Sequence, residues 1–250
     1  MKRAMNTRLL SVVSALLLTV SVYAESKVSE NRKLSGFEEI EINGSPKVVY
    51  TQGKTFSVKV EGERESVENI ETTVRGKTLE IRNKGKYGII NFSFGSSKEA
   101  VVYVTSPDLI SVTLNGSGDF ISKTRVDTDN MKILLKGSGD IDFKDIICNK
   151  CDMSLIGSGD LEVDRLESIS SSLTLIGSGD VKVGQWRVDD TDISLKGSGD
   201  ISVTFAGGCR NVNCVLQGSG DITLKGEVKR MKKQKSGSGD IDTSKLKVMP

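Results

Sequence analysis

The tetrapeptide Gly-Ser-Gly-Asp occurs seven times between residues 116 and 240, and its residue types could do three kinds of chemistry. The glycines could cradle a phosphate, the carboxylate could bind a cation, or the motif could only turn the chain. A phosphate cradle is disfavoured because the motif lacks the Lys-Ser/Thr of a nucleotide-binding loop and leads into strand-like residues rather than a helix. The aspartate would also repel a phosphate. We therefore expect no nucleotide site.

The seven aspartates recur every 19 to 21 residues, so they form one column if each repeat is one coil. Carboxylates stacked at about 4.8 Å repel one another unless solvation, hydrogen bonds or a cation relieves the charge. We expect each aspartate to hydrogen-bond its own corner in an Asx-type turn, with a weak calcium ladder as the alternative. Known calcium-binding repeats have a period of about nine residues, which 20 does not match. The column comprises Asp119, Asp140, Asp160, Asp180, Asp200, Asp221 and Asp240.

Four cysteines are a second candidate for chemistry. Cys148 and Cys151 form a Cys-x-x-Cys motif, and Cys209 and Cys214 lie three repeats later. At one coil per repeat the two pairs are roughly 14 Å apart, too far for a shared zinc ion or a disulfide between the pairs. In an oxidising compartment we expect the disulfides Cys148–Cys151 and Cys209–Cys214, or free thiols at inward positions.

Catalysis by histidine is excluded because the chain contains no His. An enzyme that acts on polysaccharides through Asp, Lys and Arg is an alternative, and it would need a cleft with two or three convergent carboxylates. A basic run at residues 225–235 could bind an anionic polymer or lipid surface. We favour a solvated polar cap that interrupts the repeat pattern near the end of the chain.

Period-two alternation on both sides of each motif indicates short half-buried strands. Ile141-Asp142-Phe143 follows one motif, and Met153-Ser154-Leu155 precedes the next. A third inward position recurs nine residues after the first glycine of the motif, which predicts that Trp186 is buried. An outward Trp186 beside Tyr or Phe would instead favour stacking on a glycan. Units of about 20 residues that cannot bury their apolar face alone predict a parallel β-helix.

The glycines of the motif are expected to form its corners, because glycine adopts unusual turn conformations without a Cβ penalty. These structural turns are at Gly116, Gly118, Gly137, Gly139, Gly157, Gly159, Gly177, Gly179, Gly197, Gly199, Gly218, Gly220, Gly237 and Gly239.

The rest of the chain divides into three parts. Residues 1–24 have a charged start, an apolar run and a small residue at Ala24, which predicts a signal peptide, and residues 25–33 are expected to be a short linker. Residues 34–250 are predicted to form one domain, with an irregular N-terminal β part at 34–114 and regular coils at 115–245. The N-terminal part should cover the first coil, and Gly44-Ser45-Pro46-Lys47 looks like a degenerate corner. Its strand candidates are Thr55–Val60, Thr78–Arg82, Ile89–Phe94 and Ala100–Val104.

Three stretches carry a resemblance to a known family: "FEEIEINGSPKVVYTQGKTFSVKVEG", "LISVTLNGSGD" and the serial GSGD repeats. In this order they resemble the head GIN domain family of putative autotransporter adhesins, over about residues 34–245. The resemblance implies an exported, right-handed parallel β-helix of the kind found in Bacteroidetes-type bacteria. It supplies no active-site residues.

These observations together predict an all-β, non-enzymatic protein of the cell envelope or surface. We expect an adhesin-like solenoid that binds an envelope or extracellular glycan or protein, and needs no cofactor unless calcium binds. The alternatives are a polysaccharide-acting β-helix enzyme and a purely structural envelope spacer. Three of the 35 basic residues lie in the predicted signal peptide, so the mature chain has 32 basic and 33 acidic residues and is almost neutral. Nucleic acid is therefore not expected as a partner. No later apolar run has spanning length and no Cys follows the leader, so we expect neither a membrane span nor a lipid anchor, and a location in the periplasm or on the cell surface.

Overall fold

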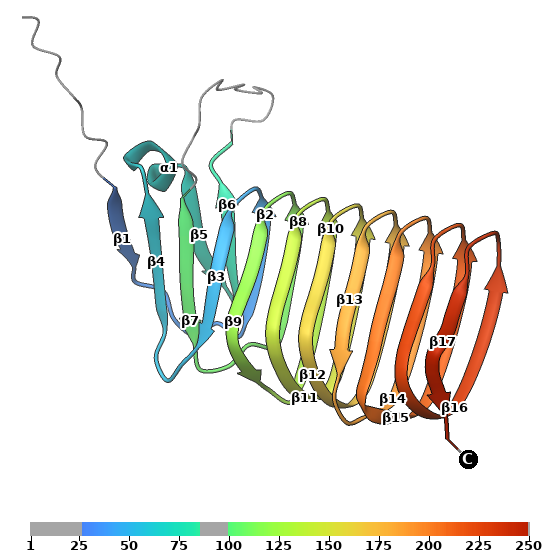
Figure 1. The fold of residues 1–250 in the computed structure, drawn as a ribbon. Helices are drawn as coiled ribbons and strands as arrows, with labels where there is room; N and C mark the ends of the chain where they lie inside the picture. The colour runs from blue at the N-terminus through green and yellow to red at the C-terminus, as the bar shows by residue number, and fades with distance from the viewer. Residues whose placement is uncertain (1–26, 86–99, 250) are drawn as a thin grey trace, which may run out of the picture.

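The computed structural model describes residues 27–85 and 100–249 and shows a β-solenoid of about seven turns (Figure 1). The coils stack side by side along the molecule, from the N-terminal strands to the C-terminal coil. The all-β solenoid predicted from the repeats is therefore confirmed. The predicted signal peptide and the strand candidate Ile89–Phe94 lie outside the described residues.

The strands are long in the regular coils and short in the N-terminal part. The N-terminal elements are β1 (Val28–Arg32), β2 (Glu39–Gly44), β3 (Lys47–Gln52), β4 (Ser57–Gly62), α1 (Arg64–Glu68), β5 (Ile70–Arg75), β6 (Thr78–Asn83) and β7 (Val101–Ser106). The coils contain β8 (Ser111–Gly116), β9 (Asp119–Asp127), β10 (Asn130–Gly137), β11 (Asp140–Gly157), β12 (Asp160–Gly177), β13 (Asp180–Gln185), β14 (Val188–Gly197), β15 (Asp200–Gly218), β16 (Ile222–Ser236) and β17 (Ile241–Val248).

Each repeat forms one coil, and neighbouring coils pair in parallel with the motifs in register. Asp140 lies beside Asp160, and Gly137 lies beside Gly157. Alternate residues point inward, as the period-two pattern predicts, and form a continuous core of mostly aliphatic side chains. Most of the large rings of the core lie toward the N-terminal end, where the rings of Phe120 and Phe143 are tilted to each other with centroids 5.1 Å apart, and Phe205 is buried in a later coil.

The two glycines of each corner are required for different reasons. Gly157 has a φ of 144°, in the region that favours glycine, and an added Cβ would lie 2.0 Å from the Gly137 carbonyl oxygen. Gly159 has no such φ, yet its Cβ would lie 1.9 Å from the Gly139 carbonyl oxygen. The first glycine thus supplies a special backbone conformation, and both allow the coils to approach closely.

The N-terminal part covers the first coil with a mixture of parallel and antiparallel strands. β2 and β3 pair in parallel with β8 and β9, which places Gly44 beside Gly116, as expected of a degenerate corner. β7 pairs in parallel with β3, and β4 pairs antiparallel with β7. The prediction of a linker at 25–33 was wrong in one respect, because Val28–Arg32 forms β1, which pairs antiparallel with β4. This pairing covers a strand edge that would otherwise be open to other chains.

The basic run near the C-terminus does not interrupt the coil pattern, contrary to the prediction. Arg230 to Ser236 pairs in parallel with β15 throughout. What changes is the residue type, because Lys233 and Lys235 occupy the columns filled by the buried Cys214 and Leu216 one coil earlier. Charged residues at inward positions end the apolar core and discourage edge-to-edge association.

Candidate functional site

The aspartate column exists, and a hydrogen bond connects each of its later members to the next coil. The Asp160 N–H donates to Asp140 Oδ1, and the same contact recurs at every later coil with lengths between 2.7 and 3.2 Å. The acceptor therefore lies one coil away, whereas the sequence suggested that each aspartate would bond within its own corner. In-register stacking explains the difference, because the N–H of the next corner lies directly beside the carboxylate.

A lysine pairs with each end of the column. Lys47 occupies the aspartate position of the degenerate first corner, and its Nζ lies 3.1 Å from Asp119 Oδ2. At the other end Lys235 Nζ lies 2.6 Å from Asp240 Oδ1. Within the described residues, no three His, Cys, Asp or Glu side chains come together closely enough to hold a metal ion. Backbone N–H groups and terminal lysines therefore offset the repulsion between the carboxylates.

A second acidic group lies on the same strands, two residues after the column. Asp142 is in register with Glu162, and together with Asp164 they line a shallow hollow of about 270 Å³. Partial burial, followed by the charges of Glu162 and Asp140, raises the pKa of Asp142 above its usual value. Lys182 from the next coil forms an ion pair with Glu162. Asp142 is thus partly desolvated, whereas Glu162 is paired with a lysine.

All four cysteines are buried free thiols. Cys148 and Cys151 point inward on either side of a corner and share a hydrogen bond, which lowers the pKa of Cys148 and raises that of Cys151. Cys209 lies in register with Val188 and Cys214 with Ile193, and no contact joins them to the first pair. Burial raises the pKa of Cys209, and it raises the pKa of Cys214 to about 12. The structure therefore describes four buried thiols, three with a raised pKa and one, Cys148, with a lowered pKa.

The prediction that Trp186 is buried was wrong: its side chain is 44% exposed. Gln185, and not Trp186, takes the inward position beside Leu166. One residue separates Val183 from Gln185, whereas two residues separate Val163 from Leu166 in the preceding coil, so the inward position is reached one residue earlier. The exposed ring is stacked by the Arg165 guanidinium at 5.1 Å rather than flanked by Tyr or Phe.

Sequence reasoning missed a buried polar cluster around Gln185, which has no exposed surface. Gln185 Nε2 donates to Ser171 Oγ at 2.8 Å, and Thr191 Oγ1 donates to Gln185 Oε1 at 2.8 Å. Ser171 Oγ donates in turn to Thr191 Oγ1. The cluster is internally satisfied, so we assign it a structural role.

One long side of the solenoid, which we call the ladder face, consists of parallel strands in register. It is the outward side of β8, β10, β14 and the C-terminal parts of β11, β12 and β15 (Figure 1). Its middle row is mostly small hydroxyl-bearing or branched side chains, and its edge row includes two exposed isoleucines between two lysines. The middle row is Thr113, Leu134, Ser154, Thr174, Ser194 and Val215, and the edge row is Asn115, Lys136, Ile156, Ile176, Lys196 and Gln217.

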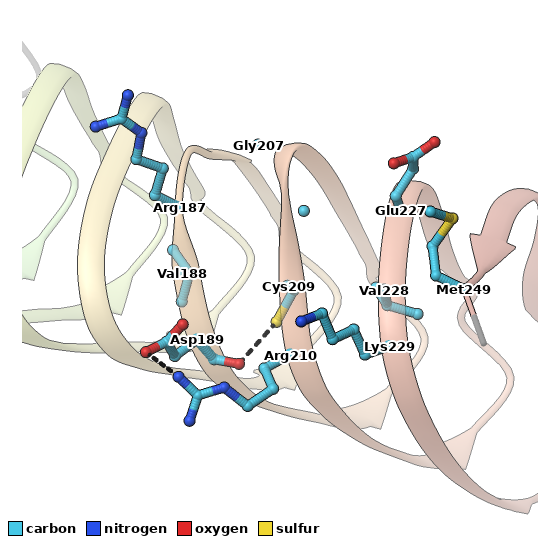
Figure 2. A pocket seen from close by; sticks show the side chains of 11 residues that line it. Arg187, Val188, Asp189, Gly207, Cys209, Arg210, Glu227, Val228, Lys229 and Met249 are labelled. Atoms are coloured by element: carbon cyan, nitrogen blue, oxygen red, sulfur yellow. Dashed lines mark hydrogen bonds and ion pairs between the residues drawn. The ribbon is translucent and has the colours of Figure 1, made fainter.

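A hollow of about 470 Å³ opens on another side of the C-terminal coils (Figure 2). Residues 187–189, 207–210 and 227–229 of three successive coils line it, together with Met249. Arg210 Nη2 lies 2.6 Å from Asp189 Oδ2, and Cys209 Sγ donates to the Asp189 carbonyl oxygen. We call this space the C-terminal hollow.

The described part of the chain contains no helix with the length and hydropathy that crossing a bilayer would need.

Comparison with known proteins places the chain by its fold. It is similar to the solved structure of a putative adhesin from Bacteroides fragilis, with 23% identity, 90% of this chain and 98% of that chain covered, and a TM-score of 0.76. A putative lipid binding protein from Parabacteroides distasonis has 23% identity, with 88% and 98% covered and a TM-score of 0.68. A putative adhesin from the same species has 18% identity, with 90% and 98% covered and a TM-score of 0.67. A search of curated proteins gave no match.

The family comparison agrees with the resemblance seen in the sequence. Residues 36–208, well over half of the chain, match the family described as "Putative auto-transporter adhesin, head GIN domain". That description supports an adhesin-like surface protein. The protein belongs to this head GIN domain family.

Proposed function

We propose that the protein is an exported, non-enzymatic adhesin-like protein that binds an extended envelope or extracellular partner, a glycan or a protein strand, along its ladder face. The observation that supports this most strongly is the unbroken register of the outward rows across six coils. Within the middle row, three successive coils present a hydroxyl about 4.8 Å apart, at Ser154, Thr174 and Ser194. A partner whose units repeat near that spacing can therefore make the same kind of contact with each of the three coils.

The chemistry of the rows suits a repeating glycan better than a folded protein partner. Ser154, Thr174 and Ser194 offer hydroxyls that both donate and accept hydrogen bonds. Ile156 and Ile176, 40% and 41% exposed, add an apolar strip on which a sugar face can lie. Several weak contacts in series give avidity that a single contact lacks.

A polysaccharide-acting enzyme is the second candidate, and the hollow beside Asp142 is the observation in its favour. Retaining glycosidases use two carboxyl groups about 5 Å apart, one of them with a raised pKa. Asp142 and Glu162 lie on neighbouring strands, and the pKa of Asp142 is raised. The ion pair between Lys182 and Glu162 argues against this function, because it occupies the carboxylate that would have to act as nucleophile.

A purely structural spacer would have neither a groove nor an exposed aromatic patch. The C-terminal hollow weighs against it, whereas Trp186, which is stacked by Arg165, is a single exposed ring and does not form such a patch.

The test of the proposal is an array of envelope glycans, peptides and lipids probed with the mature chain. The array includes lipids because one structural neighbour is described as a putative lipid binding protein. Thr174→Arg and Thr174→Glu place opposite charges in the middle of the ladder face, and Thr204→Arg and Thr204→Glu place them on an exposed position of another side. We expect both Thr174 variants to lose binding by about tenfold or more, equivalent to about 1.4 kcal/mol, and both Thr204 variants to keep it.

Two outcomes would contradict the proposal. Equal binding by the Thr174 variants and the wild type would remove the ladder face from the interaction. Release of reducing ends from an arrayed polysaccharide, abolished by Asp142→Asn, would establish the enzyme instead.

A further inference from the structure

The C-terminal hollow results from a segment on one side of the solenoid that has a different length in each of three successive coils. On this side Gln185, Phe205 and Gly226 are in register, and so are Val188, Cys209 and Val228. Two residues separate these positions in the first coil, three in the second and one in the third. The segment of the middle coil is the longest and therefore bulges outward. The segment of the third coil is the shortest, and it leaves space open beside the bulge.

The backbone around the bulge is strained in a way that the rest of the described chain is not. Arg187 is the only non-glycine residue in the described ranges with a positive φ, at 54°. A left-handed conformation costs about 1–2 kcal/mol for a residue with a Cβ. Gly208 at the bulge has a φ of 82°, which glycine adopts without strain, so the strain is confined to Arg187. Strain of this kind that the surrounding structure maintains is often found at binding sites.

The charges of the hollow are only partly balanced. Asp189 is paired with Arg210, and Glu227 with Lys247 at 3.6 Å. Lys229 has no ion-pair or hydrogen-bond partner among residues 27–85 and 100–249, and Figure 2 shows its side chain extending toward Cys209 across the hollow. The hollow therefore carries a surplus positive charge at Lys229.

The remaining lining is divided between acceptors and apolar groups. The carboxylates of Asp189 and Glu227 can accept hydrogen bonds from hydroxyl groups, and the partly exposed side chain of Met249 provides an apolar contact, whereas Val188 and Val228 are buried beneath the hollow. A sulfate ion offers only acceptors and a phosphate ion at neutral pH offers at most two donors, and both are anions, so these two carboxylates would repel either ion. A ligand with one carboxylate, several hydroxyls and one apolar face satisfies all three features.

We propose that the C-terminal hollow binds one carboxylated sugar residue of an envelope or extracellular glycan, with Lys229 pairing with its carboxylate. This inference rests on the proposed function and names the class of ligand. The volume of about 470 Å³ lies within the range of small-molecule sites and accommodates one or two sugar residues. The carboxylate approaches Lys229 while the ring hydroxyls donate to Asp189 and Glu227.

The test is an NMR titration of the ¹⁵N-labelled mature chain with glucuronate, galacturonate and N-acetylneuraminate. We expect at least one of them to shift the amide signals of Gly207, Gly208 and Cys209 at about 10 mM, well above a millimolar Kd. Glucose and the methyl ester of the active sugar acid should cause no such shifts. Lys229→Gln should weaken binding about tenfold or more, because it removes a charged hydrogen bond. Lys33→Gln, the same change at an exposed site near the N-terminal strands, should leave it unchanged.

Three results would overturn the inference. They are the absence of shifts at residues 207–210 with all three sugar acids, equal weakening by Lys229→Gln and Lys33→Gln, and displacement of the sugar acid by inorganic phosphate at equal concentration. Failure here is distinguishable from failure of the proposed function. If polymer binding depends on Thr174 but no sugar acid binds the hollow, only this inference fails. If a sugar acid binds the hollow while Thr174 variants bind the polymer normally, only the ladder face proposal fails.

Discussion

The second glycine of a corner provides a sharp test of how the coils are held together. Replacing Gly159 by Ala places a Cβ 1.9 Å from the Gly139 carbonyl oxygen, whereas Cβ contacts below 3.0 Å are essentially never seen. The two coils must separate by about 1 Å at this corner, because both atoms belong to the backbone. Overpacking costs about 1–3 kcal/mol, and stretching the two hydrogen bonds that Ser158 and Gly159 donate to Gly137 O costs about 1 kcal/mol each. We expect Gly159→Ala to lower the free energy of unfolding by about 3–5 kcal/mol.

Urea unfolding followed by far-UV circular dichroism measures this cost, and two other glycines separate its causes. Gly76 has a φ of 61° and nothing within 4 Å of an added Cβ, so Gly76→Ala measures a backbone penalty of about 1–2 kcal/mol without steric overlap, the reverse of Gly159, which has the overlap without a positive φ. Gly239 meets the same overlap as Gly159 but lies in the last described coil, which can move outward. Gly239→Ala should therefore cost less than Gly159→Ala. A Gly159→Ala cost no larger than that of Gly76→Ala would refute the steric explanation.

Four further predictions concern the carboxylates and the thiols. Asp160→Ala removes one of the two acceptors of the Asp180 N–H, which also donates to the Gly159 carbonyl oxygen, and should lower the free energy of unfolding by about 0.5–1.5 kcal/mol. Asp160→Asn keeps an oxygen there and should cost less; urea unfolding measures both. Calcium should not raise the melting temperature measured by calorimetry, and a rise that Asp160→Asn abolishes would support the calcium ladder. The pKa of Asp142 is raised in the folded protein, so its neutral form stabilises the fold below pH 3.8, and this stability is lost as pH rises through the folded pKa. Asp142→Asn should therefore raise the free energy of unfolding at neutral pH and change it little below pH 3.8. Mass mapping of oxidised protein should find any disulfide within Cys148–Cys151, and a Cys151–Cys209 link would contradict the coil register.

The coil register was predictable because identical motifs at nearly equal spacing leave few ways to pair the strands. The corner glycines and the degenerate corner followed from the same register. The direction of the aspartate hydrogen bonds did not, because sequence spacing shows which residues stack but not whether a side chain bonds within its own coil or the next.

The exposure of Trp186 and the C-terminal hollow were missed for a common physical reason. The coil that contains Trp186 is one residue shorter before Gln185 and one residue longer after it, so the two changes cancel in the motif spacing of 20. Gly184 was the available signal, because a Cβ there would lie 2.2 Å from the Asp164 carbonyl oxygen of the preceding coil. A glycine at this otherwise side-chain-bearing position indicates a tightened corner and a shifted inward column.

The most direct test of the ladder face is the dependence of affinity on ligand length. Once the array identifies a repeating partner, its oligomers can be titrated by calorimetry from one unit upward. We expect affinity to rise with each added unit and to level off at about 29 Å, the length of six coils at about 4.8 Å each. An affinity that does not change with oligomer length would contradict this expectation, because a partner held at one point gains nothing from further units.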